Sequence, residues 1–221
     1  GNWKDKRTIA EKFWKWFLIK YAGGKLIVLA TGGGINPPSS KNGNIQWIFS
    51  TSLSRNEILK ISKKTKRIKN IIRLVILCRI EKKKGVDVLI KSMSIISKKY
   101  DNIELHIVGD GSQLENYKNL SKELDCLNKI YFHGYLKHAQ AIKVLNNSDL
   151  FCFPTSSSEG FPKVVLEAMS CNLPIVTTDV SVLPLLVGNN CGRIIEKPTP
   201  ENIAKIIIEL IKNPKEYKRL S

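Results

Sequence analysis

Residues 149–178 read DLFCFPTSSSEGFPKVVLEAMSCNLPIVTT, and this segment is the clearest evidence for the fold class. Its apolar runs at 149–154 and 173–178 predict two strands, and the segment between them predicts a helix over 161–170. Both strands are apolar almost throughout, as in a parallel sheet that is covered on both faces. The stretch therefore predicts a strand–helix–strand unit of an α/β domain.

The same alternation extends in both directions from this unit. Further strands are predicted at 73–78, 103–108, 129–134 and 192–196, and further helices at 85–98, 112–124, 138–147 and 200–212. The series predicts an α/β fold, a Rossmann-like parallel sheet with helices on both faces. In such folds ligands bind beyond the carboxyl ends of the strands, so the residues that follow each strand are the candidates for function.

Residues 1–55 do not continue this series and predict a partial second α/β domain. Residues 25–30 predict a strand, with a second candidate at 45–49. We expect a preceding helix to pack on strand 25–30; the alternative is that this basic, aromatic helix lies on an anionic membrane. Its apolar stripe consists of Ala10, Phe13, Trp14, Phe17, Leu18 and Tyr21. Residues 56–72 are polar and lysine-rich, which predicts a linker.

The chain is strongly basic, with 36 Lys and Arg residues against 19 Asp and Glu residues and a net charge of +17. This excess suggests an anionic partner such as nucleic acid, a membrane surface or a phosphorylated substrate, but a solvated lysine-rich surface explains it equally well. No nucleic-acid-binding motif is recognisable, so we expect no nucleic-acid partner. No long apolar run and no signal peptide are visible, which predicts a cytoplasmic protein with at most peripheral contact at the inner face of the membrane.

The cysteine and histidine patterns argue against a disulfide framework and a metal site. The five cysteines are odd in number and form no C-x-x-C pair. Cys78 and Cys152 lie inside apolar runs, so we expect them to be buried free thiols. His106, His133 and His138 have no carboxylate or cysteine partner at ligand spacing, and no D-x-D pair occurs, so we expect no metal ligands.

Two glycine-rich segments match phosphate-binding loops only in part. Residues 109–111 read GDG, but Leu114 stands where G-x-G-x-x-G has its last glycine, so a dinucleotide fingerprint is not expected. Residues 32–34 read GGG without a following Gly-Lys-Ser/Thr, so we expect a turn and not a P-loop.

Two glutamates mark the loop and the helix that follow strand 149–154. Glu159 and Glu167 are separated by seven residues, and Gly160 follows the first of them directly. The start of helix 161–170 offers free backbone N–H groups and a positive dipole end, which suit an anionic ligand. From the spacing alone, a solvated surface explains the two glutamates better than a binding site does.

The segment EGFPKVVLEAMSCNLPIV resembles the E-x7-E signature of the retaining glycosyltransferases of the GT-B fold, specifically family 4, the glycosyl transferases group 1. Other segments are similar to that family and follow in its order: LCRIEKKKGVDVLIKS, IVGDGSQLE and YFHGYL. The resemblance covers about residues 73–212. It implies the transfer of a hexose-like sugar from a nucleoside-diphosphate sugar to an acceptor hydroxyl, with retention of the anomeric configuration.

The resemblance also implies roles for individual residues. Arg79 and Lys84 would grip the donor diphosphate and stabilise its developing charge, and Glu159 would lie near the transferred sugar, which makes these three the expected catalytic residues. Glu167 would accept hydrogen bonds from ribose hydroxyls as a partly exposed contact. The other expected donor-binding residues, which act largely through backbone groups, are Gly109, His133, Gly134, Tyr135, Gly160, Phe161, Pro162 and Lys163.

The implied donor is a sugar of the UDP or GDP type, bound without a metal or a further cofactor. The acceptor is a sugar, a lipid-linked sugar or a protein. A family member has a whole acceptor domain, so we expect residues 1–55 to be a remnant of it. Residues 73–221 are then the nucleotide-sugar-binding domain, the GT-B C-terminal domain, with its C-terminal helix truncated.

Departures from the family pattern keep a second hypothesis open. The family often has Glu in the segment where residues 183–186 read LPLL, Gly is usual at Asn172, and residues 191–193 read CGR in place of an Asn-Gly pair. These differences and the short N-terminal part favour a non-catalytic nucleotide-sugar-binding module, or a chain that is inactive alone. A third hypothesis, a basic nucleic-acid-binding protein, rests on the net charge only.

Overall fold

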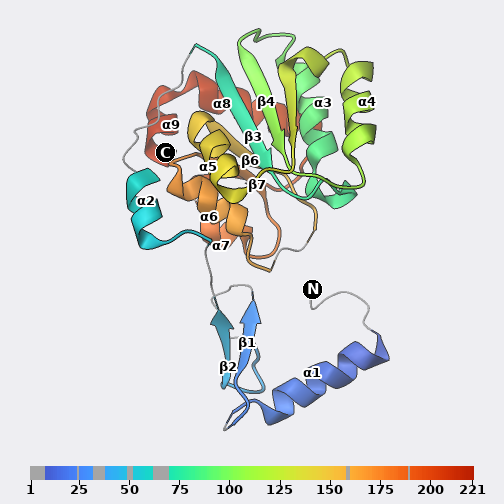
Figure 1. The fold of residues 1–221 in the computed structure, drawn as a ribbon, viewed down its shortest axis with the longest axis vertical. Helices are drawn as coiled ribbons and strands as arrows, with labels where there is room; N and C mark the ends of the chain where they lie inside the picture. The colour runs from blue at the N-terminus through green and yellow to red at the C-terminus, as the bar shows by residue number, and fades with distance from the viewer. Residues whose placement is uncertain are drawn as a thin grey trace.

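The computed structural model describes residues 8–23, 25–31, 38–48, 52–61, 70–157, 160–188 and 190–221, and its main feature is a six-stranded sheet (Figure 1). The strands lie in the order β5-β4-β3-β6-β7-β8, and every neighbouring pair is parallel. The chain order reverses between β3 and β6, so this is the topological switch point of the sheet. The strands are β3 (Ile72–Leu77), β4 (Ile103–Val108), β5 (Ile130–Gly134), β6 (Leu150–Phe153), β7 (Ile175–Thr178) and β8 (Gly192–Ile195).

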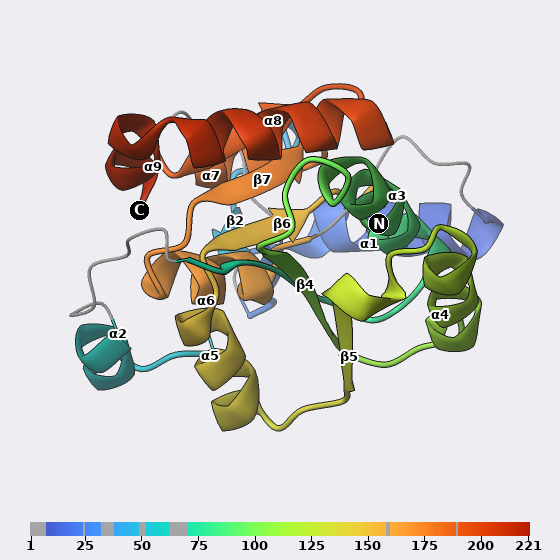
Figure 2. The ribbon, with the colours of Figure 1, turned by 90° about the horizontal axis from the view of Figure 1, so that it is seen from above.

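Helices cover both faces of this sheet (Figure 2). On one face lie α3 (Val86–Ile96), α4 (Leu114–Glu123) and α8 (Pro200–Lys212). On the other lie α5 (His138–Asn147) and α6 (Lys163–Ser170). This arrangement confirms the predicted Rossmann-like α/β fold. The predicted bounds of β4, α5 and α8 coincide with the observed ones, because each has a long periodic pattern or a clear start signal.

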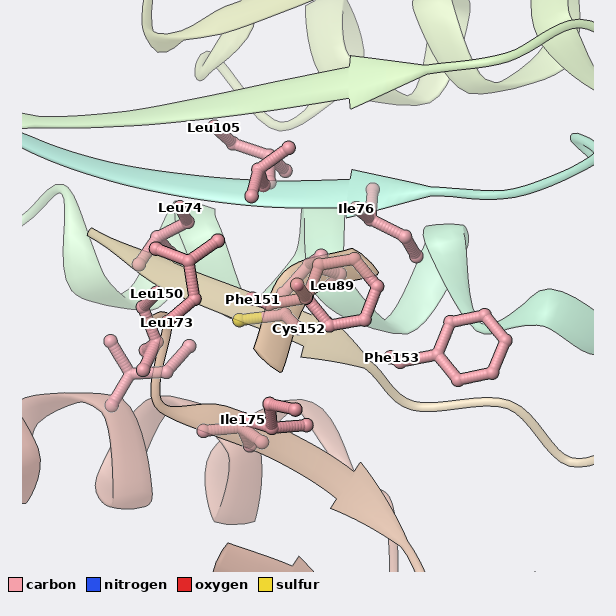
Figure 3. Packing of buried hydrophobic residues seen from close by; sticks show 14 of the residues in the cluster. Leu74, Ile76, Leu89, Leu105, Leu150, Phe151, Cys152, Phe153, Leu173 and Ile175 are labelled. Atoms are coloured by element: carbon pink, nitrogen blue, oxygen red, sulfur yellow. The ribbon is translucent and has the colours of Figure 1, made fainter. Parts of the chain in front are cut away.

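The hydrophobic core is centred on β6, and all four residues of this strand are buried (Figure 3). The rings of Phe151 and Phe153 stack with their centroids 6.0 Å apart. Leu74 and Ile76 of the neighbouring strand β3 are fully buried beside them. Burial of one large apolar side chain contributes about 1.5–3 kcal/mol to the stability of the fold. The central strands are therefore stable, and they hold the ends of the loops that follow them in place.

The α-helices α2 (Arg55–Ile61), which lies in the segment expected to begin the linker, and α7 (Leu183–Val187) were not predicted from the sequence. A further short helix, α9 (Pro214–Leu220), lies in the C-terminal region where a truncated helix was expected without given bounds. Each has only two turns or fewer, too few residues for a periodic pattern. Local signals were nevertheless present: the backbone N–H of Ser54 donates to Glu57 Oε2 at 2.8 Å in a capping-box arrangement. Asn213 caps α9 through its side chain, by accepting from the Glu216 N–H at 3.1 Å.

The N-terminal part of the chain forms a separate two-stranded sheet below the large one (Figure 1). The sheet consists of β1 (Val28–Thr31) and β2 (Ile45–Ile48), which pair in parallel, and the helix α1 (Ile9–Tyr21) precedes it. No residue of α1 is buried, and Phe13 and Trp14 are more than half exposed. The expected packing of the helix on strand 25–30 is therefore wrong, because a two-stranded sheet offers too small a surface to cover the aromatic stripe. The turn expected at residues 32–34 lies outside the described residues.

The cysteines follow the sequence expectation with one exception. All five lie in the described part of the chain and none forms a disulfide, and Cys152 is fully buried, which raises the pKa of its thiol. Cys78 is only partly buried, because it follows the last residue of β3 at the open end of the sheet. Among the described residues, no helix is long and apolar enough to cross a bilayer.

Candidate functional site

A cavity of about 490 Å³ opens at the switch point, beside the carboxyl ends of β3 and β6. Residues that follow these two strands provide most of its wall. The lining residues are Leu77, Cys78, Arg79, Glu81, Lys84, Phe153, Phe161, Pro162, Lys163 and Val164. Five of the residues predicted to bind a donor, Arg79, Lys84, Phe161, Pro162 and Lys163, therefore come together here.

The loop after β3 is fastened to the loop after β6. The carbonyl of Lys83 accepts hydrogen bonds from Ser156 N at 2.9 Å and from Thr155 Oγ1 at 3.1 Å. Gly85 adopts a left-handed conformation with φ of 75°, and a Cβ there would lie 2.1 Å from the carbonyl oxygen of Pro154. Only glycine permits this close approach of the two loops.

Lys84 gains its position from this loop contact. Its Nζ lies 3.3 Å from Ser157 Oγ, and the side chain lines the cavity while Lys82 and Lys83 are exposed. Arg79 follows β3 by two residues and is also exposed at the cavity wall. Among the described residues that line the cavity, three are cations, these two and Lys163, and one is a carboxylate, Glu81. The balance favours an anionic ligand.

The N-terminus of α6 supplies the opposite wall. The helix begins at Lys163, and Pro162 precedes it as an N-cap residue that carries no N–H. The first N–H groups of a helix have no partner within it and form the positive end of the helix dipole. A helix start beside lysine and arginine side chains is a common arrangement for binding phosphate.

Glu167 lies one turn further along α6 and is only 5% exposed. Its Oε1 lies 3.3 Å from Nε2 of His138 and accepts a hydrogen bond from the Ser52 hydroxyl. The expectation of a partly exposed carboxylate is therefore wrong: the segment before α2 and the start of α5 cover it. The sequence did not indicate Ser52 or His138 as a partner of Glu167, because neither residue is near it in the chain.

The predicted residues at the ends of β4 and β5 form a separate group. The backbone N–H of Gly109 donates to the Gly134 carbonyl at 2.9 Å, which holds the two strand ends together. Tyr135 is 78% exposed. The side chain of His133 does not line the cavity at the switch point; its Nε2 lies 2.9 Å from Nδ1 of His106, on the face of the sheet that α5 partly covers. Gly160 is exposed, and Glu159 lies outside the described residues.

A second cavity of about 410 Å³ lies on that face of the sheet and is lined by Arg73, His106, His133, Val144, Asn147 and Ser148. Glu104 Oε2 accepts from Arg73 Nε at 3.1 Å and lies 3.4 Å from His106 Nε2, so a carboxylate partner exists that the sequence spacing did not indicate. Burial lowers the pKa of both His106 and His133. Within the described part of the chain, no cluster of three His, Cys, Asp or Glu side chains is placed to hold a metal ion.

Comparison with known proteins identifies similar sequences. The family model for glycosyl transferases group 1 matches residues 57–221. An uncharacterized glycosyltransferase of Haemophilus influenzae is 33% identical over 173 residues, which cover 77% of this chain and 46% of that protein. A GDP-mannose-dependent monoacylated alpha-(1-6)-phosphatidylinositol monomannoside mannosyltransferase of Corynebacterium glutamicum is 28% identical over 148 residues, covering 63% of this chain and 38% of that protein.

Solved structures share the fold. TarM of S. aureus, crystallised as a point mutant with Fondaparinux, alpha-GlcNAc-glycerol and UDP, superposes with a TM-score of 0.71 at 20% identity. The superposition covers 100% of this chain and 43% of TarM, and it supports the GT-B architecture. The chain spans less than half the length of the curated relatives that it matches first.

Proposed function

This chain belongs to the glycosyl transferases group 1 family, and on that premise we propose that it binds a nucleoside-diphosphate sugar and serves the transfer of that sugar to an acceptor hydroxyl. The observation that carries the proposal is the cationic cavity at the switch point, where Arg79, Lys84 and the start of α6 converge. The family assignment favours this proposal over a nucleic-acid-binding protein.

Arg79 and Lys84 are proposed to bind the diphosphate. As the bond between the anomeric carbon and the leaving phosphate oxygen breaks, negative charge builds up on that oxygen, and fixed cations stabilise it. Arginine offers two parallel N–H donors for this purpose, and lysine offers a compact point charge. Backbone groups of Gly160, Phe161 and Lys163 are proposed to approach the sugar and the phosphates.

The nucleoside is proposed to lie beside the ends of β4 and β5. Glu167 would accept from the ribose hydroxyls, and Gly109 and residues 133–135 would flank the base. Glu159 is proposed to lie near the transferred sugar; this role rests on the family signature, since Glu159 is outside the described residues. We propose a retaining transfer without a metal or a further cofactor, in which the acceptor oxygen replaces the leaving phosphate on the same face of the sugar. In this scheme the acceptor proton passes to the leaving phosphate.

A structural neighbour and a sequence relative suggest the class of the donor. TarM was crystallised with UDP, and the Corynebacterium glutamicum enzyme is named for GDP-mannose. We therefore propose a UDP or GDP sugar as the donor. The acceptor is a sugar, a lipid-linked sugar or a protein, and the phosphatidylinositol monomannoside acceptor in the name of the second relative favours the lipid-linked class.

A peripheral membrane contact through α1 fits a lipid-linked acceptor. The side chains of Phe13, Trp14 and Trp16 are each more than half exposed. Lys20 Nζ lies 4.9 Å from the centroid of the Trp16 ring, so positive charge accompanies the exposed aromatic surface. Aromatic rings together with lysines are typical of helices that lie in the interface of an anionic bilayer.

Titration calorimetry tests the donor site directly. UDP, GDP and ADP are titrated in separate experiments into the 221-residue chain in the presence of EDTA. We expect at least one of the three to bind, because the proposed contacts lie within one domain of the chain. Failure of all three, with circular dichroism showing folded protein, would contradict the proposal.

A further inference from the structure

Three segments that are far apart in the sequence meet at one buried carboxylate. Glu167 on α6 is 5% exposed, and its Oε1 is contacted by His138, the first residue of α5, and by Ser52, which precedes α2. A buried carboxylate without hydrogen-bond donors is costly, and these two donors meet that need.

His138 is well placed to fix the direction of this carboxylate. A carboxylate only accepts hydrogen bonds, so the hydrogen on Nε2 of the imidazole donates across the 3.3 Å to Oε1. His138 lies four residues after Gly134, the end of β5, and its side chain is 43% exposed. It thus stands between the strand end proposed to flank the base and the carboxylate proposed to bind the ribose.

Oε1 of Glu167 accepts a hydrogen bond from the Ser52 hydroxyl while the same oxygen also contacts His138 Nε2. A ribose hydroxyl presents the same donor chemistry as this serine hydroxyl. Since a carboxylate oxygen has two lone pairs, one bond from His138 leaves room for one hydroxyl. The nucleoside would therefore take the place of Ser52, and the contact with His138 would remain.

We propose that His138 is a positioning residue that holds the Glu167 carboxylate in the direction required by the ribose hydroxyls, and that it thereby sets the preference for ribonucleoside over dideoxyribonucleoside diphosphates. The proposal rests on the function proposed above. Its physical basis is that a fixed, buried acceptor discriminates strongly against a ligand that leaves it unpaired, whereas a carboxylate free to turn to solvent does not.

The experiment compares three ligands with four proteins by calorimetry. The ligands are the nucleoside diphosphate that binds best, its 2′,3′-dideoxy counterpart and inorganic pyrophosphate. The proteins are the wild-type chain, His138→Ala, His138→Gln and the control Lys143→Gln, which changes an exposed residue on the same helix. Glutamine keeps an N–H donor near the position of Nε2, so it tests whether donation is the property that matters.

We expect the wild-type chain to prefer the ribose ligand by about tenfold or more. His138→Ala should weaken ribonucleotide binding about 3- to 10-fold and bring the preference close to one, with pyrophosphate binding unchanged. His138→Gln should restore most of the preference, and Lys143→Gln should behave like the wild type.

The possible failures point to different conclusions. An unchanged ribose preference in His138→Ala overturns this inference and leaves the proposed function standing. Equal losses for all three ligands would mean that the change disturbs the whole site, and would also overturn it. If the wild-type chain binds no nucleoside diphosphate, the proposed function itself is wrong.

Discussion

At the scale of single residues, Arg79 and Lys84 are expected to act on the diphosphate only. Arg79→Ala and Lys84→Ala should each weaken nucleoside diphosphate binding by about 1.5–3 kcal/mol, the usual range for charged hydrogen bonds. Lys84 Nζ donates to the Ser157 hydroxyl, and a charged phosphate oxygen is a stronger acceptor than that hydroxyl. Calorimetry measures the loss.

The control for this experiment is Lys82→Ala, which removes the same charge from an exposed neighbour outside the cavity wall. It should change binding by no more than a few tenths of a kcal/mol, because an exposed charge is screened by solvent and salt. A loss in Lys82→Ala as large as in Lys84→Ala would mean that net charge attracts the ligand and that no specific contact exists. The free nucleoside, which lacks phosphates, should bind all three variants alike.

At the scale of strands and their turns, Gly109 is expected to be required for the approach of β4 to β3. Its φ is 132°, and a Cβ would lie 1.9 Å from the carbonyl oxygen of Cys78. Gly109→Ala should lower the free energy of unfolding by more than about 2 kcal/mol, since it adds backbone strain and a clash with main-chain atoms. Urea unfolding measures this, with Gly43→Ala as the control, where an added Cβ meets no atom within 4 Å. Equal stability of the two variants would show that the strand ends move apart at little cost.

The histidine pair on β4 and β5 predicts how stability depends on pH. Burial lowers the pKa of His106 and His133 below the ordinary value of 6.5. Well above that value both rings are neutral in the folded and in the unfolded chain. As the pH falls through it, the unfolded chain takes up protons first, so the free energy of unfolding falls until the folded-state pKa values are passed.

The measurement is chemical unfolding at a series of pH values between about 7 and 5, the range in which an ordinary histidine titrates. The wild type should lose more stability over this range than the His106→Gln/His133→Gln variant, although carboxylates contribute a common slope to both. Glu104 and Arg73 also face the pair; Glu104 opposes the lowered pKa of His106 and Arg73 reinforces it. Parallel stability curves would show that the rings titrate alike in the folded and the unfolded chain.

At the scale of the whole molecule, the exposed aromatic helix α1 predicts binding to anionic vesicles. Tryptophan fluorescence should shift to the blue when vesicles are added, and the shift should fade as salt rises, because lysine contacts are screened. Trp14 and Trp16 are both more than half exposed, so both should report the contact. Neutral vesicles serve as the control. An equal shift with neutral vesicles, or a shift that ignores salt, would show apolar adsorption without the proposed electrostatic component.

The fold class, the order of the main elements and the family are predictable from the sequence. Long apolar strands alternate with periodic helices, and this pattern is local: it depends on neighbours within about ten residues along the chain. The E-x7-E segment and the lysine before Gly85 are likewise local motifs of consecutive residues, so they can be recognised from the sequence. The short helices are not predictable from periodicity, because two turns are too short to show a repeating apolar pattern. Ser54 and Glu57 nevertheless form a capping signal before α2.

Which of these residues share a site, and which contacts position each of them, is visible in the folded structure alone. The cavity joins Arg79 to the start of α6 because parallel strands β3 and β6 end at the same edge, a pairing that local patterns do not encode. The burial of Glu167 and its contacts with Ser52 and His138 join positions 115 and 29 residues apart. Such contacts are made by packing between elements, and packing depends on which surfaces meet after the chain has folded. The exposure of α1 is likewise not predictable from the sequence. An apolar stripe shows which face of a helix can pack, but it does not show whether a large enough partner surface is present.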